Sequence, residues 1–167
     1  MDTEAALRRA KRPASVIAGP YGHPMHAVVI TLPIGSWVAS LVFDALAFIT
    51  NEEAYALGAT WLVGIGVVGA LFAMIFGFMD YGRLTAGTKV HKVATTHMVL
   101  NIAATAVMLG SLLVRITVGA EEPNFPAFIL SLLGMALVGA SGYLGGNLAY
   151  KHGVRVADED TQREAYQ

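Results

Sequence analysis

The amino-acid sequence predicts an all-α protein, a four-transmembrane-helix bundle with both termini in the cytoplasm. Three observations support this fold class. Hydrophobic residues make up 55% of the 167 residues and charged residues only 14%, whereas soluble domains carry about 25% charged residues. Mean hydropathy is +0.57. Four apolar runs, each long enough to cross roughly 30 Å of hydrocarbon, are separated by short polar segments.

Charge and cysteine content exclude several classes of function. The formal net charge is −1, so the sequence gives no reason to expect nucleic-acid binding. The chain contains no cysteine, which excludes disulfides, thiolate-bound iron–sulfur clusters, covalently attached c-type haem and a cysteine nucleophile.

Residues 1–21 form a polar, basic arm. A secretory signal needs an apolar segment close behind its basic residues, but here the apolar run starts only at Ala27 and is long enough to span a membrane. We therefore expect a retained cytoplasmic arm, with a short surface helix from about Glu4 to Arg12.

The four-helix membrane domain is expected over residues 22–150, followed by a cytoplasmic tail over residues 151–167. The predicted spans are residues 26–49, 54–79, 91–118 and 126–150. Pro24 falls where a first helical turn would begin, a position that proline tolerates. Pro33 lies inside the first span and is expected to kink it, because proline lacks a backbone N–H.

Basic residues predict the orientation of the bundle. With four spans, both termini share one side of the membrane, and that side carries nearly all the basic residues: Arg8, Arg9, Lys11, Arg12, Arg83, Lys89, Lys92, Lys151, Arg155 and Arg163. The opposite side has only Arg115 together with four glutamates. This bias indicates a cytoplasmic location of both termini.

Small residues predict where the helices approach most closely, because lipid-embedded helices pack through them. The second span contains Gly66 and Gly69. The fourth contains Ser131 and Gly134, together with the spaced pairs Gly142-xxx-Gly146 and Ser141-xxx-Gly145. We expect the second and fourth spans to contribute the closest contacts.

All five histidines fall near the cytoplasmic side of the predicted bundle, as does the nearest carboxylate. These residues are His23, His26, His91, His97, His152 and Asp80. Histidine and carboxylate side chains bind iron, zinc and copper. Asn101 follows His97 by four residues and shares its helix face.

Two cofactor hypotheses remain open, beside a purely structural polar cluster. A b-type haem would take axial ligands from opposite sides, His97 from the third span and His26 or His23 from the first. His26 is expected to lie nearer the surface than His97, which counts against this arrangement. A bare transition metal (Fe, Zn or Cu) would be held by His23, His26 and Asp80, with His97 or His152.

Two charged residues lie within the outer parts of spans. Asp44 in the first span needs a partner if it is ionised, and Arg115 towards the far end of the third is the best candidate. We expect a structural ion pair that ties the first span to the third.

Both ends of the chain carry motifs that resemble a known family. The motifs are Gly22-His23-Pro24-Met25-His26, Leu32-Pro33-Ile34-Gly35, Phe43-Asp44 and the segment Ser141–Val154. They resemble a bacterial integral-membrane family catalogued as domain of unknown function 2231. Asp80 and the His97-to-Asn101 segment fall where that family has an acid and a His-x-x-x-Asn pattern, whereas Ala27 and Thr31 depart from it.

The resemblance implies a four-helix protein of the bacterial inner membrane with no assigned reaction. Relatives occur fused to, or encoded near, Rieske-type iron–sulfur domains, which implies redox work. We therefore expect an electron-transfer or redox accessory protein that is not an enzyme on its own. The alternative is a cofactor-free accessory subunit of a respiratory or photosynthetic membrane complex. A transporter ranks last, because four spans are few, and the sequence leaves a homo-oligomer open.

Overall fold

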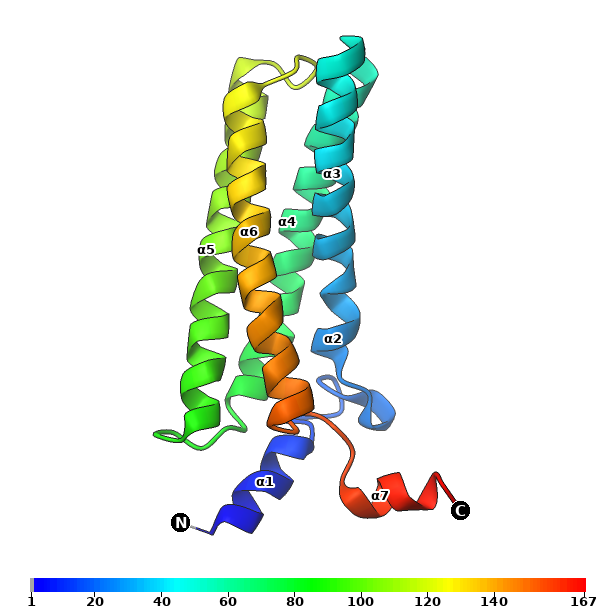
Figure 1. Ribbon diagram of the computed structural model, residues 1–167, viewed down its shortest axis with the longest axis vertical. Helices are drawn as coiled ribbons and strands as arrows, with labels where there is room; N and C mark the ends of the chain where they lie inside the picture. Colours follow the sequence, from blue (N-terminus) through cyan, green and yellow to red (C-terminus); the bar gives the residue numbers. More distant parts are fainter. Residues whose placement is uncertain (1) are drawn as a thin grey trace.

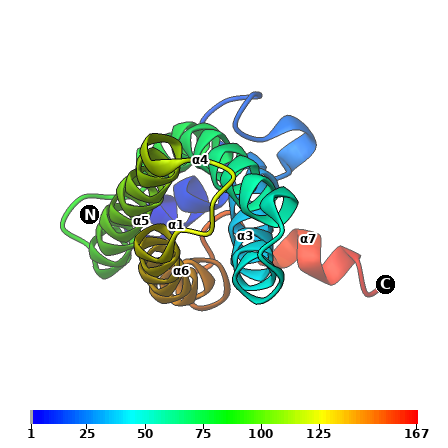
Figure 2. The same cartoon turned by 90° about the horizontal axis from the view of Figure 1, so that it is seen from above.

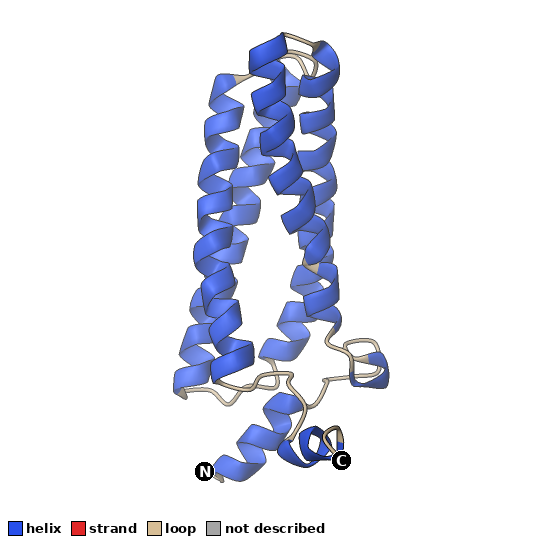
Figure 3. Cartoon of the chain, turned by 45° about the vertical axis from the view of Figure 1, so that its right-hand side comes forward, coloured by secondary structure: helices blue, strands red, loops and turns tan. Residues whose placement is uncertain are grey.

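The computed structural model describes residues 2–167, and all regular elements in this part of the chain are helices (Figure 3). Four of them are long and apolar enough to cross a membrane: Met25–Thr50, Glu53–Tyr81, Lys89–Val118 and Phe125–Lys151. They run side by side with both chain termini at one end (Figure 1). We call this the terminal end, and the opposite end the loop end. The predicted all-α bundle of four membrane-spanning helices is confirmed.

The first span is broken in two. Helix α2 (Met25–Val29) and helix α3 (Thr31–Thr50) meet at Ile30. Pro33 explains the break, because it has no N–H for the carbonyl of Val29 and its ring crowds that carbonyl. The kink predicted from Pro33 therefore appears one turn before the proline.

The other spans are continuous helices with defined caps. They are α4 (Glu53–Tyr81), α5 (Lys89–Val118) and α6 (Phe125–Gly146), which ends in a π-helical turn, η2 (Asn147–Lys151). Asn51 ends α3 in the left-handed conformation that asparagine tolerates. Thr88 and Asn124 cap α5 and α6 by accepting from the backbone N–H groups of the first turns.

The spans pack as two antiparallel hairpins, α3 with α4 and α5 with α6. Viewed along the bundle, the four helices follow one another around it (Figure 2). Trp37 of α3 lies directly over Gly66 of α4, and its Nε1 donates to the carbonyl of Val63 at 3.2 Å. In the second hairpin, Met108 lies over Gly134. Glycine thus brings the two helices of each hairpin together.

The predicted role of Gly142 and Gly146 is wrong. A Cβ atom added at either position would meet nothing within 4 Å, so these glycines form no close helix contact within residues 2–167. The other small residues predicted on this span do face its neighbours. Ser131 and Ser141 are buried, and Gly134 and Gly145 lie against side chains of α5.

Short elements close the terminal end. Helix α1 (Thr3–Lys11) lies below the bundle, a 3₁₀ turn (Pro20–Gly22, η1) leads into α2, and α7 (Glu159–Glu164) ends the chain (Figure 1). Ala10 of α1 packs against Leu84 and Ala94 in a small apolar cluster. The backbone N–H of Arg155 donates to the carbonyl of Ala10 at 3.1 Å, which joins the arm to the tail.

Candidate functional site: a histidine pair between two hairpins

The structure brings two of the five histidines into an edge-to-face contact. His26 lies on α2 and His97 on α5, with ring centroids 6.3 Å apart and ring planes at 83°. The expectation that His26 would be too shallow is wrong. Helix α5 starts eight residues before His97 and α2 only one residue before His26, so α2 begins deeper in the bundle and the two rings reach one level.

Each histidine is anchored by the second helix of its own hairpin. Nδ1 of His26 lies 2.9 Å from the carbonyl oxygen of Ala73 on α4. Nδ1 of His97 lies 2.8 Å from the carbonyl oxygen of Ser141 on α6. A carbonyl can only accept, so both rings carry their proton on Nδ1 when neutral, and Nε2 is left with its lone pair. This is the tautomer of a histidine that binds metal through Nε2.

A glycine follows each anchoring carbonyl by one helical turn. A Cβ added at Gly77 would lie 3.2 Å from the His26 ring, and one at Gly145 would lie 3.1 Å from the His97 ring. Both imidazoles therefore rest against bare helix backbone. The two hairpins repeat one arrangement of histidine, carbonyl and glycine, which the sequence spacing alone did not reveal.

His97 has additional polar neighbours. The amide nitrogen of Asn101 lies 3.1 Å from Nε2 of His97 and donates to Oγ of Ser141 at 2.7 Å. The hydroxyl of Ser141 lies 2.9 Å from Nδ1 of His97. The predicted shared face of His97 and Asn101 is thus in contact, and any ligand that approaches Nε2 of His97 has to displace the Asn101 amide.

The remaining predicted ligands lie elsewhere at the terminal end. Asp80 pairs with Arg155 at 3.1 Å, and Arg155 also donates to the carbonyl of His23 at 3.5 Å. The His91 ring packs on Tyr81, and His152 follows η2. Within residues 2–167, no three histidine, aspartate or glutamate side chains gather as a metal site would require. The structure thus joins only His26 and His97 of the five proposed metal ligands.

Arg155 is a functional candidate that the sequence analysis missed. Its side chain is 6% exposed, and its guanidinium also donates to the carbonyls of Lys11 and Ala18. It therefore holds the arm, the tail and the end of α4 together. The sequence shows Arg155 only as one of many basic residues near the terminal end, and nothing in that pattern distinguishes it.

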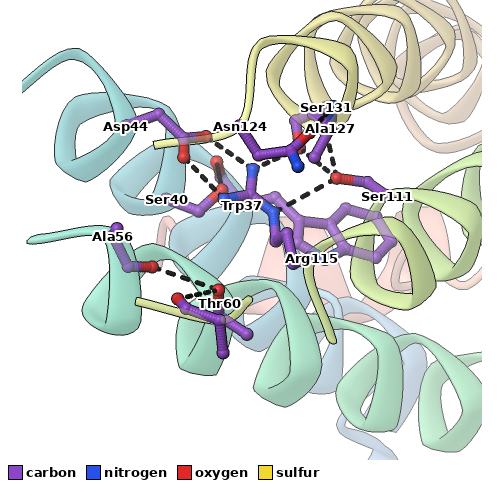
Figure 4. Close-up of polar contacts among 11 residues, drawn as sticks. Trp37, Ser40, Asp44, Ala56, Thr60, Ser111, Arg115, Asn124, Ala127 and Ser131 are labelled. Carbon is purple, nitrogen blue, oxygen red and sulfur yellow. Dashed lines mark hydrogen bonds and ion pairs between the residues drawn. The ribbon is translucent and has the colours of Figure 1, made fainter. Parts of the chain in front are cut away.

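A second polar centre lies towards the loop end (Figure 4). Arg115 of α5 donates to both carboxylate oxygens of Asp44 on α3, at 2.6 and 2.7 Å. It also donates to Oγ of Ser111 and Oγ of Ser131, both at 3.3 Å. The charged groups of Asp44 and Arg115, which we expected to pair, are each 3% exposed, and they link the two hairpins.

Comparison with known proteins identifies the family. A family model described as "Predicted membrane protein (DUF2231)" matches residues 22–158, which cover all four spans. No curated protein and no solved structure matches the chain. The match covers most of the sequence, and the four spans fit the description of a membrane protein. The chain therefore belongs to the DUF2231 family of membrane proteins.

Proposed function

We propose that the protein is a redox accessory protein of the bacterial inner membrane that holds a cofactor between His26 and His97. A b-type haem is the favoured cofactor and a transition metal ion the alternative. The observation that supports the proposal is the pair of imidazoles, one from each hairpin, whose ring centroids lie 6.3 Å apart.

The spacing of the rings fits a metal bound between them. The ring centroids lie only 6.3 Å apart, so His26 and His97 would hold one metal ion or one haem iron between them once each Nε2 atom turned towards it. The two histidines come from helices on different hairpins. The anchors at Ala73 and Ser141 fix the ring orientation and raise the basicity of Nε2, as such hydrogen bonds do at metal sites.

A bound haem would supply one-electron transfer, while the protein would set its position and potential. Gly77 and Gly145 allow each imidazole to rest against a helix, so the ligands have little freedom to rotate. The carbonyl acceptors favour electron donation from the imidazoles. Asn101 occupies the space beside Nε2 of His97 and would turn away to admit iron.

A cofactor-free accessory subunit is the second candidate. The observation that favours it is the cluster of His97, Asn101 and Ser141, whose hydrogen bonds are satisfied within the protein. In this case the histidines would only join helices, and the protein would comigrate with a larger respiratory or photosynthetic complex on a native gel.

Absorption spectroscopy with metal analysis of gently purified protein tests the proposal. We expect a Soret band that disappears in His26→Ala and in His97→Ala, whereas the control His91→Ala, a histidine outside the pair, keeps it. The Soret band separates the two cofactors, because a bare metal ion held by imidazoles would appear in the metal analysis without such a band. A folded wild-type protein that is colourless and free of metal would contradict the proposal.

We also propose that the terminal end faces the cytoplasm, because basic residues of short loops stay on that side. The chain has no cysteine, so single cysteines introduced at Ser15 and at Asn51 give a clean accessibility test in intact cells. An impermeant thiol reagent should modify the cysteine at position 51 and spare the one at position 15. The reverse result would invert the orientation.

A further inference from the structure

Four arginines from two distant parts of the sequence gather at the terminal end. Arg8, Arg9 and Arg12 belong to α1 and its C-terminal cap, and Arg83 follows α4. Together with Ala5 they line an open hollow of about 350 Å³. The lining contains no acidic residue, so the hollow concentrates positive charge.

The walls of this hollow are fixed to each other. Nε of Arg9 donates to the carbonyl of Arg83 at 3.0 Å, and its terminal nitrogen donates to the hydroxyl of Thr85 at 2.6 Å. These bonds join α1 to the turn between α4 and α5, more than seventy residues away along the chain. The arginines are thus placed by tertiary structure, which is what a binding site requires.

Three of the four arginines of the hollow have no ion-pair partner among the described residues. Among residues 2–167, only Arg8 of these four forms an ion pair, with Glu4, and both side chains are largely exposed. Nε of Arg83 is buried without a hydrogen-bond acceptor. Buried donors without acceptors are unfavourable, and neighbouring guanidinium groups repel each other. An anion bound in the hollow would relieve the repulsion between the guanidinium groups.

Phosphate is the anion that suits this donor set. The planar guanidinium group binds phosphate oxygens through two parallel hydrogen bonds and is less strongly hydrated than a lysine ammonium. A volume of about 350 Å³ lies at the lower end of the range for small-molecule sites. It is sufficient for a phosphate and its glycerol substituent.

The depth of the hollow indicates a lipid source for that phosphate. The 29 residues of α4 span about 44 Å at 1.5 Å per residue, close to the roughly 40–45 Å of a bilayer with its headgroups. Arg83, two residues beyond α4, therefore lies near headgroup level. Val16 and Ile17, in the segment after α1, are 80% and 72% exposed, as expected for apolar side chains that enter the membrane interface.

We propose that this hollow is a binding site for the phosphate group of an anionic phospholipid, held by Arg8, Arg12 and Arg83. Arg9 positions the wall by its bonds to the turn. The site ties α1, and with it the whole arm, to the membrane surface beneath the histidine pair.

Lipid retention in nanodiscs tests this site with the full-length protein. The nanodiscs contain phosphatidylcholine with a minor fraction of phosphatidylglycerol, and native mass spectrometry counts the phosphatidylglycerol molecules that stay bound. A basic residue near an anionic surface contributes about fivefold to binding. We expect Arg12→Gln to lower phosphatidylglycerol retention about fivefold and Arg83→Gln to lower it at least as much.

The variants are chosen to keep the test decisive. Arg12 is exposed, so Arg12→Gln should fold even if Arg83→Gln does not. Arg163→Gln removes the same charge from the exposed tail helix and should leave retention unchanged. Equal loss in all three variants, or no loss in any, would overturn the site. Stabilisation of the protein by inorganic phosphate or glycerol phosphate, without preference for phosphatidylglycerol, would overturn the lipid source.

Discussion

The two polar centres of the bundle differ in how completely the protein satisfies them. Towards the loop end, the guanidinium group of Arg115 donates hydrogen bonds to Asp44 and to two serine hydroxyls, and the whole cluster is buried. Nearer the terminal end, His26 and His97 are half-buried, and the His26 ring has a single backbone anchor. A saturated cluster is suited to holding helices together, whereas Nε2 of His26, which forms no hydrogen bond within residues 2–167, is suited to receiving a ligand.

Removal of the carboxylate from the loop-end centre should have the largest effect. Asp44→Asn leaves Arg115 buried without a counter-charge, and loss of one partner of a buried ion pair costs about 3–5 kcal/mol. Reversible unfolding in mixed micelles at increasing fractions of dodecyl sulfate measures the change. The double variant Asp44→Leu with Arg115→Met should recover most of the loss, because no buried charge remains. Unchanged stability of Asp44→Asn would show that the pair does not hold the hairpins together.

The next largest effect is expected where Trp37 of α3 packs on Gly66 of α4. Gly66→Ala places a methyl group against the indole of Trp37, and overpacking of a close-packed core costs about 1–3 kcal/mol. Gly64→Ala is the matched control, because a Cβ there would meet only Leu112 methyl groups at 3.9 Å. The same unfolding assay should separate the two variants. Equal stability would mean that α4 can shift away from Trp37 without cost.

The histidine pair should respond to a small change that barely alters stability. Gly145→Ala puts a methyl group 3.1 Å from the His97 ring, so the ring has to turn and the cofactor should bind less tightly. The neighbouring control Gly146→Ala meets nothing within 4 Å. We expect a several-fold lower cofactor occupancy, read from the absorption spectrum, in Gly145→Ala alone. Loss of occupancy in both variants would indicate a general effect on α6 and not a displaced ligand.

The sequence was sufficient for the features that depend on composition and on single residues. Apolar run length predicted the four spans, Pro33 predicted the break in the first, and matching depth indicated Asp44 and Arg115 as partners. The sequence did not show how each helix is rotated about its axis or at what depth in the bundle each helix begins. For that reason the anchoring carbonyls of Ala73 and Ser141 were not foreseen. The sequence also could not tell the small residue of α6 that packs, Gly134, from Gly142 and Gly146, which do not. Backbone acceptors leave no mark in a sequence, because every residue has one.

The smallest effect is expected for an ion pair of similar chemistry outside the bundle. Lys11 binds Glu159 at 2.9 Å, but the glutamate side chain is 73% exposed, and exposed pairs are screened by water and salt. The hydrogen bond and charge of Lys11 lower the pKa of Glu159. The small stabilisation is therefore present above the ordinary glutamate pKa and is lost as the pH falls through the lowered value. Glu159→Gln should be only slightly less stable than wild type at neutral pH, and the difference should disappear as the pH falls and Glu159 of the wild type is protonated. A loss as large as that of Asp44→Asn would show that docking of the tail, and not burial of charge, determines what an ion pair contributes in this protein.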